Sequence, residues 1–147
     1  RIDTEDGDIE LLNCQGDDFE ITIEDGDLTM DGGNGKLYAN VEDGDLDFRN
    51  GNFREVELIT EDGDVILETH LMDGGMYDLD GEDATIELIV LSGAGTFTIS
   101  RDDARVSASS AFELTRETES RVAYQLGTGG AEVRISTKDG RVKLEKN

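Results

Sequence analysis

The sequence predicts an all-β protein wound as a single-stranded β-helix (β-solenoid) with coils of 18–19 residues. The first observation behind this prediction is that Glu-Asp-Gly-Asp occurs four times, with its glycine at Gly7, Gly26, Gly44 and Gly63. The second is that apolar and polar residues alternate on both sides of each copy, which is the pattern of a strand with one buried face. Near-identical units at a fixed spacing are typical of a solenoid, in which equivalent residues of successive coils stack.

Each of the four units has apolar or β-branched residues at the same offsets, so we expect continuous internal columns. Before the turn the columns are Ile2, Ile21, Ala39 and Leu58, and then Thr4, Ile23, Val41 and Thr60. After the turn they are Ile9, Leu28, Leu46 and Val65, and then Leu11, Met30, Phe48 and Leu67. The glycine supplies the positive φ that the turn between the two strands requires.

The same pattern of apolar positions predicts two later units whose sequences have diverged from Glu-Asp-Gly-Asp. One surrounds Ala94-Gly95, and the last surrounds Asp139-Gly140. Their apolar positions are Leu88, Val90, Phe97 and Ile99 in the first, and Val133, Ile135, Val142 and Leu144 in the second. We therefore expect one repeat-built domain over residues 1–147.

Two stretches of this domain are predicted to be irregular, around residues 69–84 and 100–121. From 69 to 84 we expect a long Gly/Asp-rich connection with a degenerate turn at Gly81. From 100 to 121 we expect short strands around Val106 and from Phe112 to Leu114, followed by a polar loop.

No segment has to be helical, and proline is absent. An Asp-Gly pair between alternating runs is also the strongest short signal for a β-hairpin. An antiparallel β-meander or barrel is therefore the alternative to the solenoid.

The net charge of the chain indicates which classes of partner it can bind. It has 36 Asp and Glu against 13 Lys and Arg, a formal net charge of −23. Such a field repels nucleic acid and anionic membrane surfaces and attracts cations or basic proteins, so we expect no nucleic-acid partner. No apolar run approaches the roughly 20 residues of a membrane span. Cys14 is the sole cysteine, which predicts no intramolecular disulfide and a small residue packed with apolar neighbours.

The acidic turns are the one candidate metal site. Hard cations such as Ca²⁺ and Mg²⁺ bind clustered carboxylate and carbonyl oxygens, so the sequence suggests no cofactor other than a weakly bound Ca²⁺ or Mg²⁺. The candidate ligands are Asp6, Asp8, Asp25, Asp27, Asp43, Asp45, Asp62 and Asp64. We favour a solvated turn instead, because Asp before Gly is good turn chemistry and exposed charge opposes edge-to-edge aggregation.

Specific calcium motifs do not match the sequence. The acidic runs lack the ligand spacing of an EF-hand, and no nonapeptide repeats as in a calcium β-roll. The densest acidic cluster outside the repeats is Asp78, Asp80 and Asp83, and we interpret it as a solvated loop.

Catalysis is the least favoured function. Paired carboxylates act as acid and base in glycosidases, but 36 carboxylates form many pairs by chance. The chain has no Trp to stack on sugar, and its only His is His70, which we expect on the surface. No nucleophile elbow, phosphate loop or metal-spaced His/Cys set occurs. We therefore predict no catalytic residues.

The chain resembles the bacterial putative-adhesin family of β-strand-repeat (β-solenoid) domains. The resemblance lies in the recurrent Asp-Gly-Asp-[Ile/Leu/Val] units, in "LIVLSGAGTFTI" (88–99) and in "AEVRISTKDGRVKLEK" (131–146). It covers essentially the whole chain and implies an exported or envelope-associated β-solenoid with no catalytic residues. The Glu-Asp before each glycine departs from the family, in which Ser or Asn commonly stands there.

On these grounds we expect a non-catalytic, extracytoplasmic, adhesin-like module with an interaction or structural role. The expected partner is a cell-surface protein or a polysaccharide, and unpaired end coils offer a route to self-association. The alternatives are a Ca-binding surface module stabilised by its stacked Asp/Glu turns and a polysaccharide-acting enzyme of β-helix type.

Overall fold

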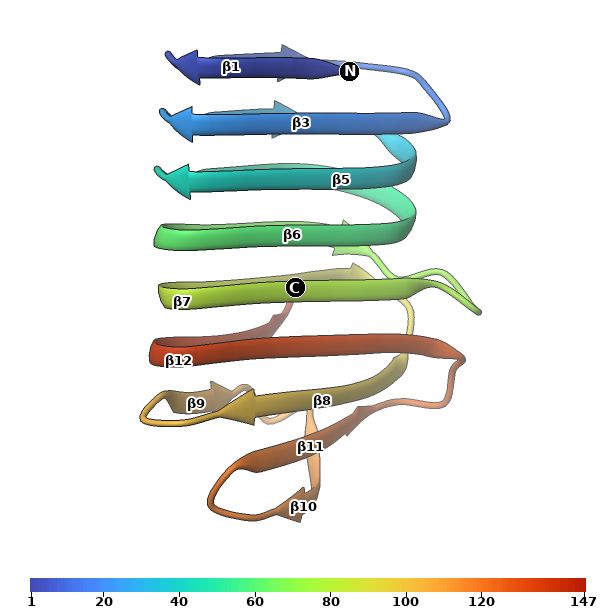
Figure 1. Ribbon diagram of the computed structural model, residues 1–147. Coiled ribbons are helices and arrows are strands. Elements are labelled where there is room, and N and C mark those ends of the chain that lie inside the picture. The colour runs from blue at the N-terminus through green and yellow to red at the C-terminus, as the bar shows by residue number, and fades with distance from the viewer.

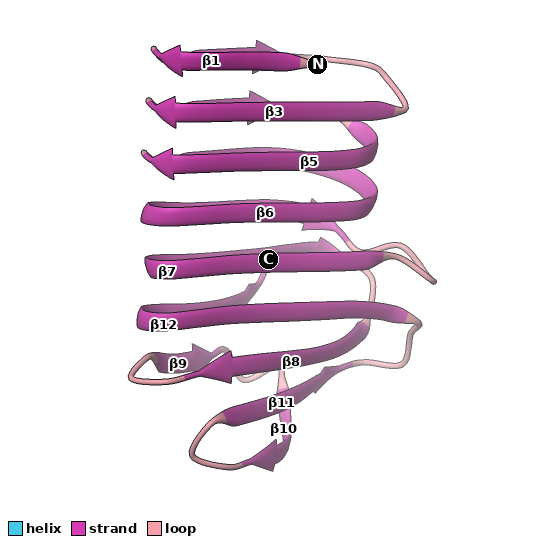
Figure 2. Cartoon of the chain, viewed as in Figure 1, coloured by secondary structure: helices cyan, strands magenta, loops and turns pink.

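The computed structural model describes all 147 residues and contains strands and turns but no helix (Figure 2). The front strands stack as rungs, and each rung turns a corner and continues along a second face (Figure 1). The upper strands are β1 (Ile2–Asp6), β2 (Ile9–Leu12), β3 (Asp18–Asp25), β4 (Leu28–Asp31) and β5 (Asn34–Asp43). The others are β6 (Leu46–His70), β7 (Met76–Ser92), β8 (Gly95–Arg101), β9 (Arg105–Ala108), β10 (Glu113–Glu117), β11 (Arg121–Leu126) and β12 (Ala131–Lys146).

The predicted all-β solenoid is confirmed, because successive coils pair in parallel. The strand order along the front is β1-β3-β5-β6-β7-β12-β8-β11-β10. Every neighbouring pair from β1 to β8 is parallel, and only β8–β11 and β11–β10 are antiparallel. The alternative of an antiparallel meander or barrel is therefore wrong for the repeats. Each Asp-Gly pair turns a corner within one coil instead of closing a hairpin.

The predicted apolar columns are confirmed, and the register shows how far they extend. The column that begins at Ile2 and Ile21 continues through Ala39, Leu58, Leu79, Ile135 and Ile99. Thirty buried residues form one core cluster, and Cys14 is partly buried against it. Because burial of one large apolar side chain contributes about 1.5–3 kcal/mol, these columns are the main source of stability.

The corner glycines are required by the close approach of successive coils. Gly26, Gly44 and Gly63 have φ angles of 149°, 151° and 150°, which residues with a Cβ rarely adopt. A Cβ at Gly26 would also collide with the carbonyl oxygen of Gly7, and one at Gly44 with that of Gly26. Glycine therefore allows both the turn and the strand spacing between coils.

The irregular stretch at 69–84 is shorter than the sequence predicted. β6 continues to His70 and β7 begins at Met76, so the connection is confined to residues 71–75. The predicted turn at Gly81 is wrong, because Gly81 pairs with Thr60 inside the strand and Ala84 stands beside Gly63 at the corner. The prediction failed because the corner residue of this coil is alanine.

The predicted turn at Ala94-Gly95 is also misplaced. Ala94 lies in the connection from β7 to β8 at the opposite side of the coil, where its carbonyl accepts a hydrogen bond from the N–H of Ala131, and Gly95 is the first residue of β8. The apolar residues assigned around them are nevertheless all buried; they are Leu88, Val90, Phe97 and Ile99. The predicted turn at Asp139-Gly140 is confirmed, since Gly140 lies beside Ala84.

The C-terminal coil is inserted between two earlier coils. β12 pairs in parallel with β7 on one side and with β8 and β9 on the other (Figure 1). The chain therefore builds β8 to β11 first and returns through residues 127–130 to occupy the space next to β7. Neighbours in space are here far apart in the sequence.

The charges of β12 complement those of β7. Arg134 lies beside Asp78 and Lys143 beside Glu87 in the register. The Nζ of Lys138 is 3.1 Å from Oε1 of Glu82. Opposite charges on adjacent strands contribute roughly 0.2–1 kcal/mol per pair, so a basic coil is favoured at this position in an acidic stack.

The two ends of the stack differ. At the lower end the β10–β11 hairpin follows β8, and Phe112 packs edge-to-face on Phe97 with ring centroids 5.1 Å apart. At the upper end β1 pairs with β3 alone, and Ile2, Ile9 and Leu11 are only half-buried. The structure has no helix with the length and apolar character needed to cross a membrane.

The inserted position of β12 predicts a large effect of truncating its core residues. Ile135 is 1% exposed between Leu79 and Ile99, so Ile135→Ala should lower the free energy of unfolding by about 2–5 kcal/mol. Ile2→Ala, in the half-buried upper coil, should cost clearly less. Urea denaturation measures both changes. Equal losses would contradict an interior position for β12.

Candidate functional site

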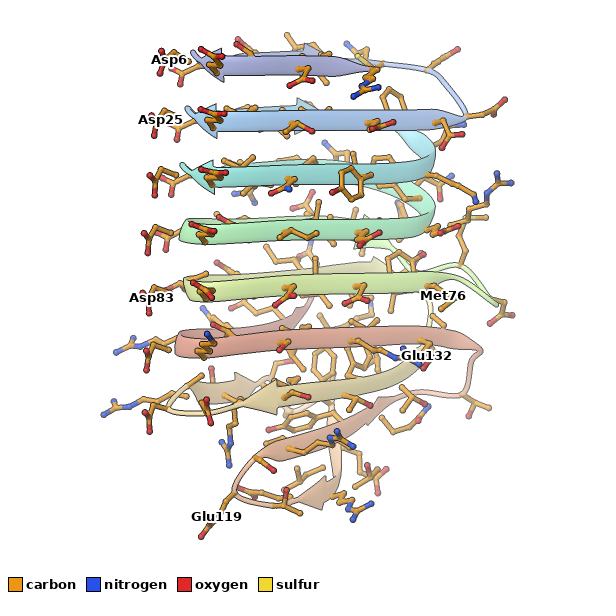
Figure 3. All side chains as sticks on the ribbon, in the orientation of Figure 1. Asp6, Asp25, Met76, Asp83, Glu119 and Glu132 are labelled. Atoms are coloured by element: carbon orange, nitrogen blue, oxygen red, sulfur yellow. The ribbon has the colours of Figure 1, made fainter.

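The eight aspartates predicted as metal ligands all lie exposed at one corner of the solenoid, in two columns. The first column is Asp6, Asp25, Asp43 and Asp62, which are register partners on successive coils and continue to Asp83 and Asp139. The second column is Asp8, Asp27, Asp45 and Asp64, just after the glycines. Figure 3 shows Asp6, Asp25 and Asp83 one above another at this corner.

The second column forms a ladder of hydrogen bonds between coils. The N–H of Asp27 donates to Oδ1 of Asp8 at 2.9 Å, that of Asp45 to Asp27 at 2.8 Å, and that of Asp64 to Asp45 at 2.9 Å. The carboxylates of Asp8, Asp27 and Asp45 thus each accept a hydrogen bond from a backbone N–H of the next coil, and a buried N–H group without a partner would be costly. These aspartates have a structural role.

The corner does not gather ligands around one point. No group of three or more His, Cys, Asp or Glu side chains could hold a metal ion. The carboxylates are instead spread along a line at the strand spacing of about 4.8 Å, whereas Ca²⁺ takes 6–8 oxygens at roughly 2.3–2.6 Å. Calcium binding by these aspartates therefore stays a prediction without geometric support.

The other acidic cluster lies on a strand and not in the predicted loop. Asp78, Asp80 and Asp83 are on β7, and Asp80 lies between Ile59 and Ser136 on the adjacent coils. Burial, followed by the charges of Asp78 and Glu82, raises the pKa of Asp80. Partial burial in the first place, and the two neighbouring carboxylates in the second, therefore destabilise the ionised form of Asp80.

His70 connects two coils at the end of β6. Its Nδ1 is 2.6 Å from Oγ of Ser92, at the end of β7. This contact gives His70 a structural role near the surface.

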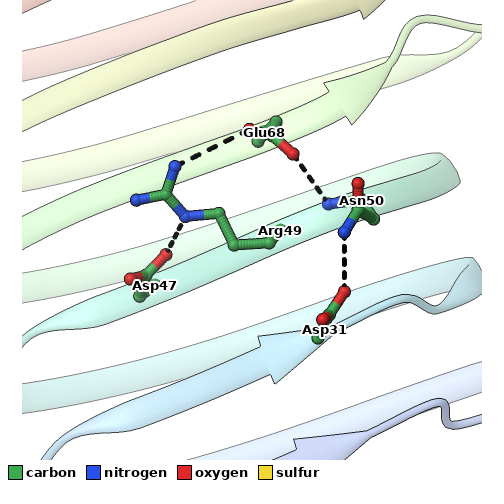
Figure 4. Close-up of polar contacts among 5 residues, drawn as sticks. All are labelled: Asp31, Asp47, Arg49, Asn50 and Glu68. Atoms are coloured by element: carbon green, nitrogen blue, oxygen red, sulfur yellow. Dashed lines mark hydrogen bonds and ion pairs between the residues drawn. The ribbon is translucent and has the colours of Figure 1, made fainter.

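A polar network on the second face joins three coils, and no motif in the sequence predicts it (Figure 4). Nε of Arg49 donates to Oδ1 of Asp47 at 2.6 Å, and its guanidinium is 3.6 Å from Glu68. Asn50 donates its backbone N–H to Glu68 at 3.2 Å and its side-chain amide to Asp31 at 2.8 Å. The hydrogen bond to Asp47 raises the pKa of Arg49, and the guanidinium offsets negative charge on this acidic face.

Charge is sorted between the two parts of the chain. Residues 1–100 carry 28 acidic and 4 basic side chains, a net charge of −24, whereas residues 101–147 carry 8 acidic and 9 basic ones, a net charge of +1. The latter residues form β9 to β12, in the lower half of the stack (Figure 1). The solenoid therefore has a strongly acidic upper half and a nearly neutral lower half that holds most of the cations.

The aspartate ladder predicts that an acceptor, and not a charge, is required at Asp45. Asp45→Ala removes the acceptor for the N–H of Asp64 and should cost about 0.5–1.5 kcal/mol in urea denaturation. Asp45→Asn keeps an oxygen acceptor and removes one like charge, so its stability should equal or exceed that of the unmodified protein.

Asp43→Ala is the matched control, because its carboxylate lies in the neighbouring column outside the ladder. It should leave stability unchanged or slightly raised. If Asp45→Asn were as destabilising as Asp45→Ala, the hydrogen-bonded ladder would not explain the role of this residue.

Salt should stabilise the protein without selectivity for calcium. Screening weakens repulsion between stacked carboxylates, so NaCl and CaCl₂ at equal ionic strength should raise the Tm equally. Thermal unfolding monitored by circular dichroism measures this. A saturable additional shift with CaCl₂, lost in Asp45→Asn, would establish the calcium site.

Comparison with known proteins gives the family of the chain but names no activity. A similar solved structure is that of a putative cell adhesion protein from Clostridium sporogenes, with 13% sequence identity, a TM-score of 0.44 and coverage of 86% of this chain. The match spans 56% of that protein, so this chain corresponds to little more than half of its length. No curated protein matches the sequence. The Toastrack DUF4097 family matches residues 1–145, and the chain belongs to this family.

Proposed function

We propose that the chain is a non-catalytic, adhesin-like interaction module of an exported or envelope-associated protein. The observation that supports this best is the sorting of charge along a stack whose coils are joined by continuous parallel strand pairing. Such a stack fixes the relative positions of its exposed side chains. It presents an acidic surface and a nearly neutral surface as two separate areas for contact.

The acidic upper half favours basic partners and rejects polyanions. A net charge of −24 on residues 1–100 speeds encounter with cationic surfaces and slows encounter with nucleic acid. The lower half lacks this repulsion and suits a neutral or acidic partner. A cell-surface protein or polysaccharide is the partner class that this function requires.

The proposal predicts saturable retention on a cell-envelope preparation. The labelled protein should co-sediment with envelopes at physiological salt, and excess unlabelled protein should displace it. An acidic protein of similar size and charge serves as the control for nonspecific retention. Retention no greater than that of the control would overturn the proposed function.

Two further measurements separate this function from its alternatives. Light scattering at low and high salt reports self-association through the end coils, and a monomer under both conditions rules out simple filaments. Turnover of a polysaccharide panel that is lost on changing specific carboxylates would replace the interaction module by an enzyme.

A further inference from the structure

Two adjoining hollows open on the outer face of the sheet where β12, β8 and β11 lie side by side. Their volumes are about 280 and 480 Å³, and they share Ser100, Arg121 and Ser136. Ser100 is the register partner of both Ser136 and Arg121. The hollows exist because short hydroxyl side chains occupy the middle of a face that longer side chains surround.

The smaller hollow is cationic. Arg101, Arg121 and Lys138 line it together with one carboxylate, that of Asp102, and it has no hydrophobic lining residue. Arg101 is 3.4 Å from Glu117, and Lys138 is 3.1 Å from Glu82. Arg121 forms no ion pair, so its guanidinium is available to an anionic group from outside.

The larger hollow carries both signs of charge. Arg121 and Arg134 line it with Asp78 and Glu132, and Glu132 pairs with Arg134 at 2.7 Å. Thr98, Ser100 and Ser136 add hydroxyl groups. Donors and acceptors placed side by side match sugar hydroxyls, which both donate and accept hydrogen bonds.

The electrostatic field of the protein allows an anionic ligand to bind at the hollows but repels it from the acidic upper coils. Residues 101–147 hold 9 of the 13 cations and have a net charge of +1. Because exposed charges are screened beyond about 8 Å at physiological salt, the acidic upper coils act weakly at the hollows. Those coils nevertheless repel a polyanion that extends toward them, which favours approach from the lower end.

We propose that the two hollows together bind an acidic polysaccharide. One sugar carboxylate lies in the smaller hollow against Arg121, and the hydroxyls of an adjoining sugar lie in the larger hollow between Arg134 and Asp78. An arginine fork binds a carboxylate through two parallel hydrogen bonds, and the larger hollow is in the size range of small-ligand sites. The assignment rests on the proposed interaction function and names its ligand class.

The test is calorimetric titration of the full chain with an oligogalacturonate at physiological salt. Three control ligands are titrated in the same way. A maltooligosaccharide of equal length tests whether charge is needed, inorganic phosphate tests whether any anion binds, and duplex DNA tests whether any polyanion binds. We expect saturable binding of the oligogalacturonate and at least tenfold weaker binding of the other three. Phosphate or DNA bound as tightly as the oligogalacturonate would overturn the assignment to a saccharide, and equal binding of the maltooligosaccharide would overturn the role of charge.

Two substitutions locate the site. Arg121→Ser should weaken binding about tenfold or more, because it removes a charge-assisted pair. Arg54→Ser is the matched control, since Arg54 is exposed and forms no ion pair but lies on β6 away from the hollows. Equal losses in both variants would show nonspecific attraction and overturn the site.

A third variant separates loss of binding from loss of folding. Ser136→Phe fills the floor of both hollows without changing charge, and its Tm should stay close to that of the unmodified protein while oligogalacturonate binding falls. Undiminished binding by this variant would also overturn the site. If the protein is retained on envelopes but does not bind oligogalacturonate, only the ligand assignment fails; absence of both would overturn the proposed function itself.

Discussion

The corner at each Asp-Gly pair is the constraint on which the structure depends. There the chain changes direction while the backbone of the next coil lies one strand spacing away, so no Cβ fits at Gly26, Gly44 or Gly63. The glycine N–H donates to the carbonyl of the aspartate on the next coil, as in Gly26 to Asp43 at 3.0 Å. The carboxylate of the aspartate after the glycine accepts a hydrogen bond from the backbone N–H of the equivalent aspartate on the next coil, as Asp27 does from Asp45. Apolar columns can stack only because this corner repeats without a shift in register.

The same repetition has an electrostatic cost that the fold offsets in part. Aspartates in register on six neighbouring coils repel one another at roughly 0.9 kcal/mol per neighbouring pair in water, and exposure to solvent and salt keeps that cost low. Away from the corner, on the second face, Arg49 pairs with Asp47 and Glu68 and so offsets negative charge there. The insertion of β12 next to β7 adds Asp139 to the column beside Asp83, but it also brings Arg134, Lys138 and Lys143 next to the acidic residues Asp78, Glu82 and Glu87.

This insertion also sets the surface on which the proposed ligand site depends. Ser136 and Lys138 come from β12, Ser100 from β8 and Arg121 from β11, so three segments separated in the sequence form one hollow. If β12 had followed the hairpin at the lower end, Ser136 would not lie beside Ser100. Topology has thus placed the cations of the C-terminal third around short hydroxyl residues.

The sequence by itself determined the coil, because its period, its alternating apolar residues and its corner glycines are local properties that repeat. It determined the aspartate columns as well, but not their hydrogen-bonded ladder, which joins residues 18 or 19 positions apart. It mislocated the corner at Ala84, since alanine carries no turn signal. Only the tertiary structure decided the order of the coils and formed the ligand-sized hollows. The repeat pattern of β12 does not specify which coils lie on either side of it. Its position depends on charge and packing against β7 and β8, which a one-dimensional pattern does not contain.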